Sequence, residues 1–172
     1  MTLDIRAYDD MTYGMYLVGA LGPGGKPNAM IANTVFQVTA ELGRIAACVN
    51  KESLTHEYIK NSGFFCAQPV KEGADMIFVG NFGFHTGRGF DKFAKYKYKL
   101  TANNLPAVLD NTLDIIEAKV EQAIDAGTHT IFIGAVIAAE ILGDGRPLTY
   151  AYYKEVMRGK TPRGATTFKG DK

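Results

Sequence analysis

Apolar runs rich in β-branched and aromatic side chains are separated along the chain by turn-forming glycines and prolines. Runs of this kind predict β-strands, and they lie at residues 11–21, 29–40, 44–50, 64–70 and 130–142. The sequence GPGGKPN joins the first two runs as a hairpin turn, and Gly134 is expected to bend the last one.

One helix is predicted without ambiguity. Residues 52–63 carry apolar side chains at helical spacing, with Ser53 as an N-cap and Gly63 as a stop. Residues 73–84 are consistent with a second, short helix. Residues 111–125 fit neither the helical nor the strand period better than the other.

The remaining segments are interpreted from their composition. The glycine-containing residues 83–92 predict a flexible loop, and residues 91–101, with lysines between tyrosines, predict an edge strand with a solvated charged face. Residues 103–111 are typical of a loop, and residues 148–153 predict a last strand. The basic, turn-rich residues 158–172 predict a tail that is mobile or lies on a partner.

Many strands, few helices and no regular β-α-β alternation favour a mainly β fold. The pattern fits an antiparallel β-barrel with inserted helices. No internal repeat or linker divides the 172 residues, and this length suits one domain with a sizeable core. We therefore expect one domain over residues 1–157, followed by the basic tail at residues 158–172.

Charge and hydropathy exclude several classes of function. The net charge is +1, and no basic stripe with interleaved aromatic residues indicates nucleic-acid binding. The longest apolar run, residues 131–139, is far shorter than the roughly 18 to 20 residues that span a bilayer. The N-terminus carries charges where a signal peptide has an apolar core. We expect a cytoplasmic protein that binds neither membrane nor nucleic acid.

The common catalytic and metal-binding motifs are missing from the sequence. Cys48 and Cys66 lie within apolar runs and are expected to be reduced thiols. The sequence GFHTGRGFDK has Lys92 where a dinucleotide fingerprint has its third glycine. No metal site is expected, because the histidines lack the short spacing of zinc ligands; they are His56, His85 and His129.

The stretch NKESLTHEY, residues 50–58, carries one candidate site. A strand end leads directly into a helix start, where free N–H groups favour an anion. Lys51 adds a charge, and Ser53 and Thr55 add hydroxyl groups. The spacing is equally compatible with a phosphate site and with simple helix capping beside a solvated lysine.

Two further stretches carry candidate chemistry. In KPNAMIANTVFQVT, residues 26–39, polar side chains recur along an apolar strand, which fits either an outward polar face or a planar ring lying along the strand. In GTHTIFIG, residues 127–134, a histidine stands at the mouth of a strand. His129 is open to three interpretations, as a packed core residue, a metal ligand or a residue facing a ligand.

These stretches occur together in one known family. With SGFFCAQPV and GRGFDKF, they make the chain resemble the flavin reductase-like, FMN-binding split-barrel proteins over nearly its whole length. The resemblance is closest to the branch that includes the flavin domain of high-molecular-weight rubredoxins. It implies an antiparallel Greek-key split barrel and a homodimer. The family's Gly-Asp-His motif is here Gly127-Thr128-His129.

The resemblance also implies the site residues. It assigns His129 a catalytic place beside the flavin, where the nicotinamide approaches. It draws the FMN-binding residues from two segments, the first against the ring system and the second around the phosphate: Asn28, Met30, Ala32, Asn33, Thr34, Val35, and Asn50, Lys51, Ser53, Thr55.

The implied activity is an oxidoreductase that takes hydride from NADH or NADPH onto FMN. Its electrons would pass to free flavin, ferric iron or a redox protein such as a rubredoxin. Two alternatives remain at this point: an electron-transfer flavoprotein reduced by a protein partner without nicotinamide, and a flavin-binding protein without turnover.

Overall fold

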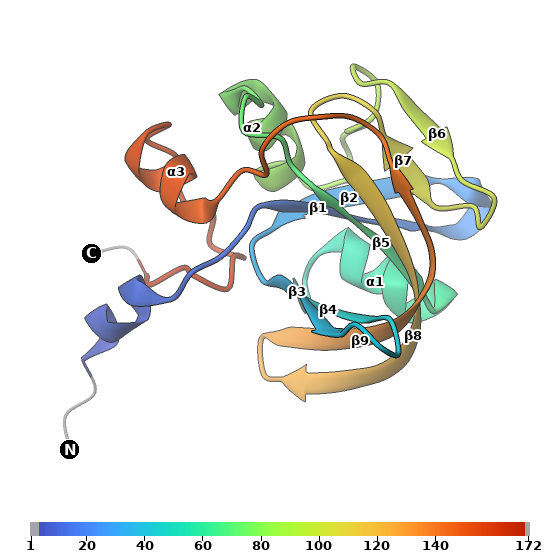
Figure 1. Cartoon of the computed structure of the whole chain (residues 1–172), viewed down its shortest axis with the longest axis horizontal. Helices are drawn as coiled ribbons and strands as arrows, with labels where there is room; N and C mark the ends of the chain where they lie inside the picture. The colour runs from blue at the N-terminus through green and yellow to red at the C-terminus, as the bar shows by residue number, and fades with distance from the viewer. Residues whose placement is uncertain (1–3, 171–172) are drawn as a thin grey trace.

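The structure is a computed structural model that describes residues 4–170 (Figure 1). Within these residues, most strands form one antiparallel sheet in the order β2-β1-β5-β8-β9-β4-β3. The strands of this sheet are β1 Tyr16–Leu21, β2 Pro27–Ala32, β3 Val35–Thr39, β4 Arg44–Asn50, β5 Phe64–Pro69, β8 Asp114–Ala126 and β9 His129–Ile141. A separate hairpin pairs β6 Tyr98–Leu100 with β7 Pro106–Val108.

Three α-helices and two short 3-10 helices complete the described chain. They are α1 Leu54–Ser62, α2 Met76–Gly83, α3 Tyr150–Glu155, η1 Ile5–Asp10 and η2 Pro23–Gly25. In Figure 1, α1 lies in the curl of the sheet, whereas α2 and α3 lie together on its outer side.

The sheet closes into a barrel because its two edge strands are consecutive in the sequence. β2 and β3 are at opposite ends of the strand order, yet only Asn33 and Thr34 separate them. A link of two residues spans only about 10 Å, so the sheet must curl until its edges meet. The Cys48 N–H donates to the Thr34 carbonyl at 2.9 Å, which fixes the link to β4. The expected antiparallel split barrel is confirmed.

The strand predictions are wrong or incomplete at several points. The single strand expected at residues 29–40 is interrupted at the β2–β3 link. The ambiguous residues 111–125 mostly form β8, which pairs with both β5 and β9. The expected loop at residues 103–111 contains β7, and the edge strand expected at residues 91–101 is reduced to β6.

The last strand, expected at residues 148–153, is instead the start of helix α3. The Thr149 hydroxyl accepts a hydrogen bond from the Tyr152 N–H at 3.2 Å and caps the helix. A threonine in this position stabilises a helix start. Tyr150 and Tyr152 are therefore helical, although tyrosine by itself favours strands.

The barrel interior is filled by alternate side chains of the strands together with one face of α1. In β4, Ile45, Ala47 and Val49 point into this core, so that Cys48 faces the opposite side. In β9, a Cβ on Gly134 would lie 2.9 Å from both Ala118 Cβ of β8 and Phe65 Cε1 of β5. Glycine therefore permits the close approach of strands at the expected bend.

A second core lies on the outer face of β1 and β2, under α2 and α3. Lys92 lies beside this core and is only 4% exposed, although it falls in the segment expected to be a flexible loop. Its ammonium donates to the carbonyls of Ala29 at 3.0 Å and of Phe82 at 3.1 Å. Lys92 thus ties β2 to the C-terminal end of α2, where helix carbonyls favour a positive charge.

Two other expectations concern thiols and membrane spans. Cys48 and Cys66 are free thiols, and burial raises the pKa of Cys66 to about 12. Between residues 4 and 170, no helix combines the length and apolar character that a membrane span requires.

We expect Lys92→Met to change how stability depends on pH. Burial lowers the pKa of Lys92 from 10.5 to about 8. Between about pH 8 and 10.5 the unfolded chain holds a proton that the native chain has released, so the lysine makes stability rise with pH there. The free energy of unfolding of the unsubstituted protein should therefore rise relative to that of the variant by up to about 1.4 kcal/mol per pH unit.

Urea denaturation at several pH values measures this difference. Lys95→Met, at an exposed lysine of the same segment, is the matched control. Parallel pH curves for the unsubstituted protein and Lys92→Met would contradict the assignment.

Candidate functional site

A pocket lies at the split of the barrel. Its floor is formed by the ends of β2, β4 and β9, one wall by α2 and α3, and its cover by the chain that follows α3. The residues lining it from the barrel and helices are Met15, Met30, Ile31, Ala32, Asn33, Cys48, Asn50, Val79, Gly83, Phe84, His129, Tyr150 and Tyr153.

Five residues predicted from the sequence meet in this pocket. Met30 and Ala32 come from β2 and Asn33 from the link that follows it, whereas Asn50 comes from the end of β4 and His129 from the start of β9. Asn50 and His129 are register partners in the β4–β9 pair. These strand ends converge because the sheet curls at the β2–β3 link.

The β2–β3 link supplies the polar rim of the pocket. Asn33 is 7% exposed, and Thr34 Oγ1 donates to its Oδ1 at 3.3 Å. The backbone N–H groups of Asn33 and Thr34 lie outside the strand ladders, and within residues 4–170 neither has a hydrogen-bond acceptor, so they can serve as donors at the rim. Val35, predicted with them, instead points into the barrel core.

His129 is held by its two ring nitrogens. Nε2 lies 3.2 Å from the Gly164 carbonyl, which only accepts, so Nε2 carries the proton of the neutral ring. Nδ1 then accepts from the Thr128 hydroxyl at 2.9 Å. His129 lines the pocket and is not a core residue, and no group of potential metal ligands exists in the described chain. Thr128 orients the ring although it replaces the acidic residue of the family's motif.

The junction between β4 and α1 lies beside the pocket. Ser53 caps α1, because its Oγ accepts from the His56 N–H at 3.1 Å and donates to the Asn50 carbonyl at 2.8 Å. The Leu54 N–H of the first turn has no acceptor within the helix. The Lys51 ammonium lies 2.6 Å from Oδ1 of Asp125, near the end of β8.

The pair between Lys51 and Asp125 is exposed to solvent. The side chains are 36% and 73% exposed, and the lysine lowers the pKa of the Asp125 carboxyl by its hydrogen bond. An exposed ion pair of this kind contributes little to stability. Another anion can therefore replace Asp125 beside Lys51 at a small cost in free energy.

Asn28 and Thr55 are separated from the pocket. The Asn28 amide donates to Thr55 Oγ1 at 2.8 Å, and both residues are buried at the contact between β2 and α1. Asn28 also borders a second hollow of about 460 Å³, next to Gly87 and Lys92. This pair joins the two predicted segments to each other.

Several lining residues escaped the sequence analysis. Cys48 stands two positions before Asn50 on the same face of β4, and the strand period could have placed it there. Tyr150 and Tyr153 carried no such signal, because their segment predicted a strand.

The residues of the pocket fit a flat aromatic ligand with one polar edge. Side chains of Met30, Val79 and Tyr150 offer apolar contact, whereas Asn33 and His129 offer hydrogen bonds at the rim. The capped helix start and Lys51 are suited to a phosphate at the same end of the barrel.

Comparisons with known proteins agree with this geometry. The flavin reductase like domain matches residues 8–160. The chain is 45% identical over 166 residues to the high molecular weight rubredoxin of Moorella thermoacetica, spanning 96% of this chain and 72% of that protein. It is 42% identical over 166 residues to the ferric-chelate reductase (NAD(P)H) of Archaeoglobus fulgidus, spanning 96% of this chain and 98% of that protein.

A solved structure shows the same fold. The NADH:FAD oxidoreductase of Streptomyces globisporus C-1027 aligns with a TM-score of 0.71 and 23% identity, over 82% of this chain and 87% of that chain. The chain belongs to the flavin reductase like domain family, as the sequence motifs indicated. It is an oxidoreductase of the flavin reductase type.

We expect Gly87→Ala to destabilise the protein by about 1–3 kcal/mol, the usual cost of overpacking. The new Cβ would lie 2.0 Å from Asn28 Oδ1 and 3.0 Å from Leu54 Cδ2. Gly89→Ala is the matched control, because nothing lies within 4 Å of its Cβ. Thermal unfolding of both variants measures the effect, and equal midpoints would show that the Gly87 contact is not tight.

Proposed function

We propose that the protein is an FMN-dependent oxidoreductase that takes hydride from NADH or NADPH. The observation that carries this proposal is the convergence of Asn33, Asn50 and His129 on an apolar pocket at the barrel split. The relatives support it, since one is named a ferric-chelate reductase (NAD(P)H) and another a flavin reductase (NADH).

Two segments of the chain would hold the cofactor. Within the first segment, Met30 to Thr34 would lie along the ring system, with the N–H groups of Asn33 and Thr34 at its polar edge. The junction from Asn50 to Ser53 would receive the phosphate, and the buried pair of Asn28 and Thr55 would hold the two segments together. Lys51 would then exchange Asp125 for the phosphate, because a dianion attracts the ammonium more strongly than one exposed carboxylate does.

A bound flavin supplies the hydride-accepting chemistry that the chain's own side chains lack. The chain positions the reactants and stabilises charge. The unpaired N–H groups of the β2–β3 link would stabilise negative charge that develops at the polar edge of the ring system. The Nε2–H of His129 would hold the carboxamide of the nicotinamide at the pocket mouth, in place of the Gly164 carbonyl.

The electron acceptor and the assembly are also proposed. The relationship to the high molecular weight rubredoxin favours a redox protein as acceptor, with free flavin and ferric iron as alternatives. We propose a homodimer, because the edge strand β3 exposes Phe36 at 50% and Val38 at 44%. A mass by light scattering equal to that of one chain, at high concentration and with FMN bound, would contradict the dimer.

We expect Lys51→Ala to weaken the binding of FMN by roughly tenfold to a hundredfold and that of riboflavin much less. Only FMN carries the phosphate, and a charged hydrogen bond contributes about 1.5 to 3 kcal/mol. Fluorescence titration with both ligands measures the difference.

The matched control for this variant is Asp125→Asn. It retains the hydrogen bond that Asp125 accepts from the Gly127 N–H but removes the charge that competes for Lys51. Its affinity for FMN should be equal or higher. An equal loss of both ligands in Lys51→Ala would place the phosphate elsewhere.

We expect His129→Ala to slow the reduction of bound FMN by NADH and NADPH while FMN affinity stays nearly unchanged. Hydride transfer requires close and well-oriented reactants, so a small misplacement slows it greatly. Reduction by dithionite needs no such orientation and should be unaffected. Stopped-flow absorbance on the unsubstituted protein and the variant measures all three rates.

The same experiment separates the alternative functions. Rapid reduction of the unsubstituted protein by a nicotinamide supports the reductase. Reduction only by a reduced redox protein would show an electron-transfer flavoprotein, and no reduction by any biological donor would show a flavin-binding protein without turnover. A variant that keeps its full rate would remove His129 from the reaction.

A further inference from the structure

The residues after α3 fold back over the pocket. We call residues 159–168 the strap, and part of it forms the outer wall of the pocket. The lining residues of the strap are Lys160, Thr161, Pro162, Gly164, Ala165 and Thr166. This part of the chain was expected to be mobile or to lie on a partner, but it rests on its own barrel.

Hydrogen bonds attach the strap to the polar rim of the pocket. Thr166 Oγ1 donates to Asn33 Oδ1 at 2.6 Å and lies 2.8 Å from Thr34 Oγ1. The Asn33 amide donates to Thr167 Oγ1 at 3.0 Å. The Gly164 carbonyl accepts from His129. The strap therefore occupies the side chains of Asn33 and Thr34 at the rim, and it also occupies the Nε2–H of His129, which the proposed function assigns to the nicotinamide.

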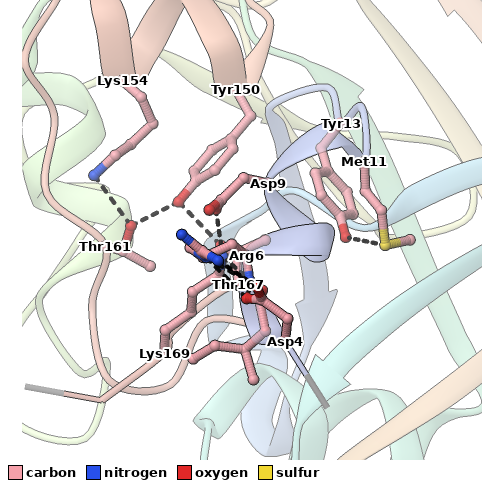
Figure 2. Close-up of polar contacts among 11 residues, drawn as sticks. Asp4, Arg6, Asp9, Met11, Tyr13, Tyr150, Lys154, Thr161, Thr167 and Lys169 are labelled. Carbon is pink, nitrogen blue, oxygen red and sulfur yellow. Dashed lines mark hydrogen bonds and ion pairs between the residues drawn. The ribbon is translucent and has the colours of Figure 1, made fainter. Parts of the chain in front are cut away.

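A second set of contacts attaches the strap to α3. Figure 2 shows the Tyr150 hydroxyl between Thr161 and Thr167, at 2.6 Å and 3.0 Å. At the start of the strap, Arg158 has a φ of 57° and Gly159 packs on the ring of Tyr153. A positive φ at a non-glycine residue is a sparsely populated conformation, and it turns the chain from α3 into the strap.

The strap fills the space that a ligand needs. Of the strap residues, only Gly159 is buried, so the strap is held mainly by hydrogen bonds, among them those that Tyr153 and Lys154 donate to the carbonyls of Lys160 and Gly159. With the strap in place the cavity is about 40 Å³. Ligand pockets occupy roughly 300 to 1,000 Å³, so a flavin ring and the strap in this position do not fit together.

We propose that the strap is a displaceable cover of the flavin pocket. Strap and flavin compete for Asn33 and for the space of the pocket, and strap and nicotinamide compete for His129, so that flavin enters only when the strap swings away at Arg158 and Gly159. This inference rests on the proposed function, because it takes flavin as the ligand of the pocket. Its consequence is that the strap sets the rate at which the flavin-free chain takes up FMN.

Two variants of the full chain displace the strap without altering the residues beneath it. A Cβ on Gly159 would lie 2.1 to 2.4 Å from ring atoms of Tyr153, so Gly159→Ala pushes the start of the strap outward. Gly164→Ala is the matched control, because its Cβ would lie at an ordinary 3.5 Å from Asn50 Nδ2. The double change Thr166→Val and Thr167→Val keeps the shape of the strap and removes the hydrogen bonds of its hydroxyl groups to Asn33 and Thr34.

The first measurement is the association rate of FMN with each flavin-free protein, followed by flavin fluorescence in a stopped-flow instrument. We expect Gly159→Ala and the double valine variant to take up FMN on the order of tenfold faster than the unsubstituted protein, since each lost hydrogen bond shifts the opening equilibrium several-fold. Gly164→Ala should behave as the unsubstituted protein does.

The second measurement is cleavage by trypsin after Lys160, followed by mass spectrometry of the released C-terminal fragment. FMN should accelerate this cleavage in the unsubstituted protein by displacing the strap. Equal association rates in all four proteins, or protection of Lys160 by FMN, would overturn the strap proposal. Failure of all four proteins to bind FMN would overturn the proposed function and, with it, the strap proposal.

Discussion

The link of two residues between β2 and β3 is the constraint on which the rest of the structure depends. Asn33 and Thr34 join strands at opposite edges of the sheet, so the sheet cannot remain open. The same closure brings the ends of β2, β4 and β9 together and exposes N–H groups that the ladders leave unpaired. One local feature thus creates the barrel, the position of the pocket and the polarity of its rim.

The sequence predicted those parts of the fold that local patterns determine. Helix α1 has its cap, its stop and its apolar face within one short segment, and it forms as expected. The sequence of β8 shows no clear alternation of apolar and polar residues, because its two halves have different surroundings. The first half is largely buried beside β5, whereas the end of the strand is exposed in a hairpin with β9. The helix α3 depends on a threonine cap that outweighs two tyrosines with strand preference.

The candidate site was predicted where residues close in sequence also lie close in space. The end of β2 and the end of β4 were found in this way, and motif similarity added His129. The roles of Thr34 and Asn28 needed the structure, because the partner of each lies far along the chain: Thr166 for Thr34 and Thr55 for Asn28. No sequence pattern places residues 159–168 over the pocket. The strap contacts the barrel through hydrogen bonds, and its sequence lacks the regular spacing of apolar residues that predicts a buried helix or strand.

The far end of the strap is fastened to the beginning of the chain. The Lys169 ammonium donates to the Ile5 carbonyl at 3.1 Å and pairs with Asp9, so that η1 anchors the residues just beyond the strap. Residues 5–10 therefore help to hold the strap over the pocket, although they do not line it. An affinity tag fused ahead of η1 would lie close to the contacts of Lys169. The choice of which end carries the tag can therefore alter how firmly the strap is held.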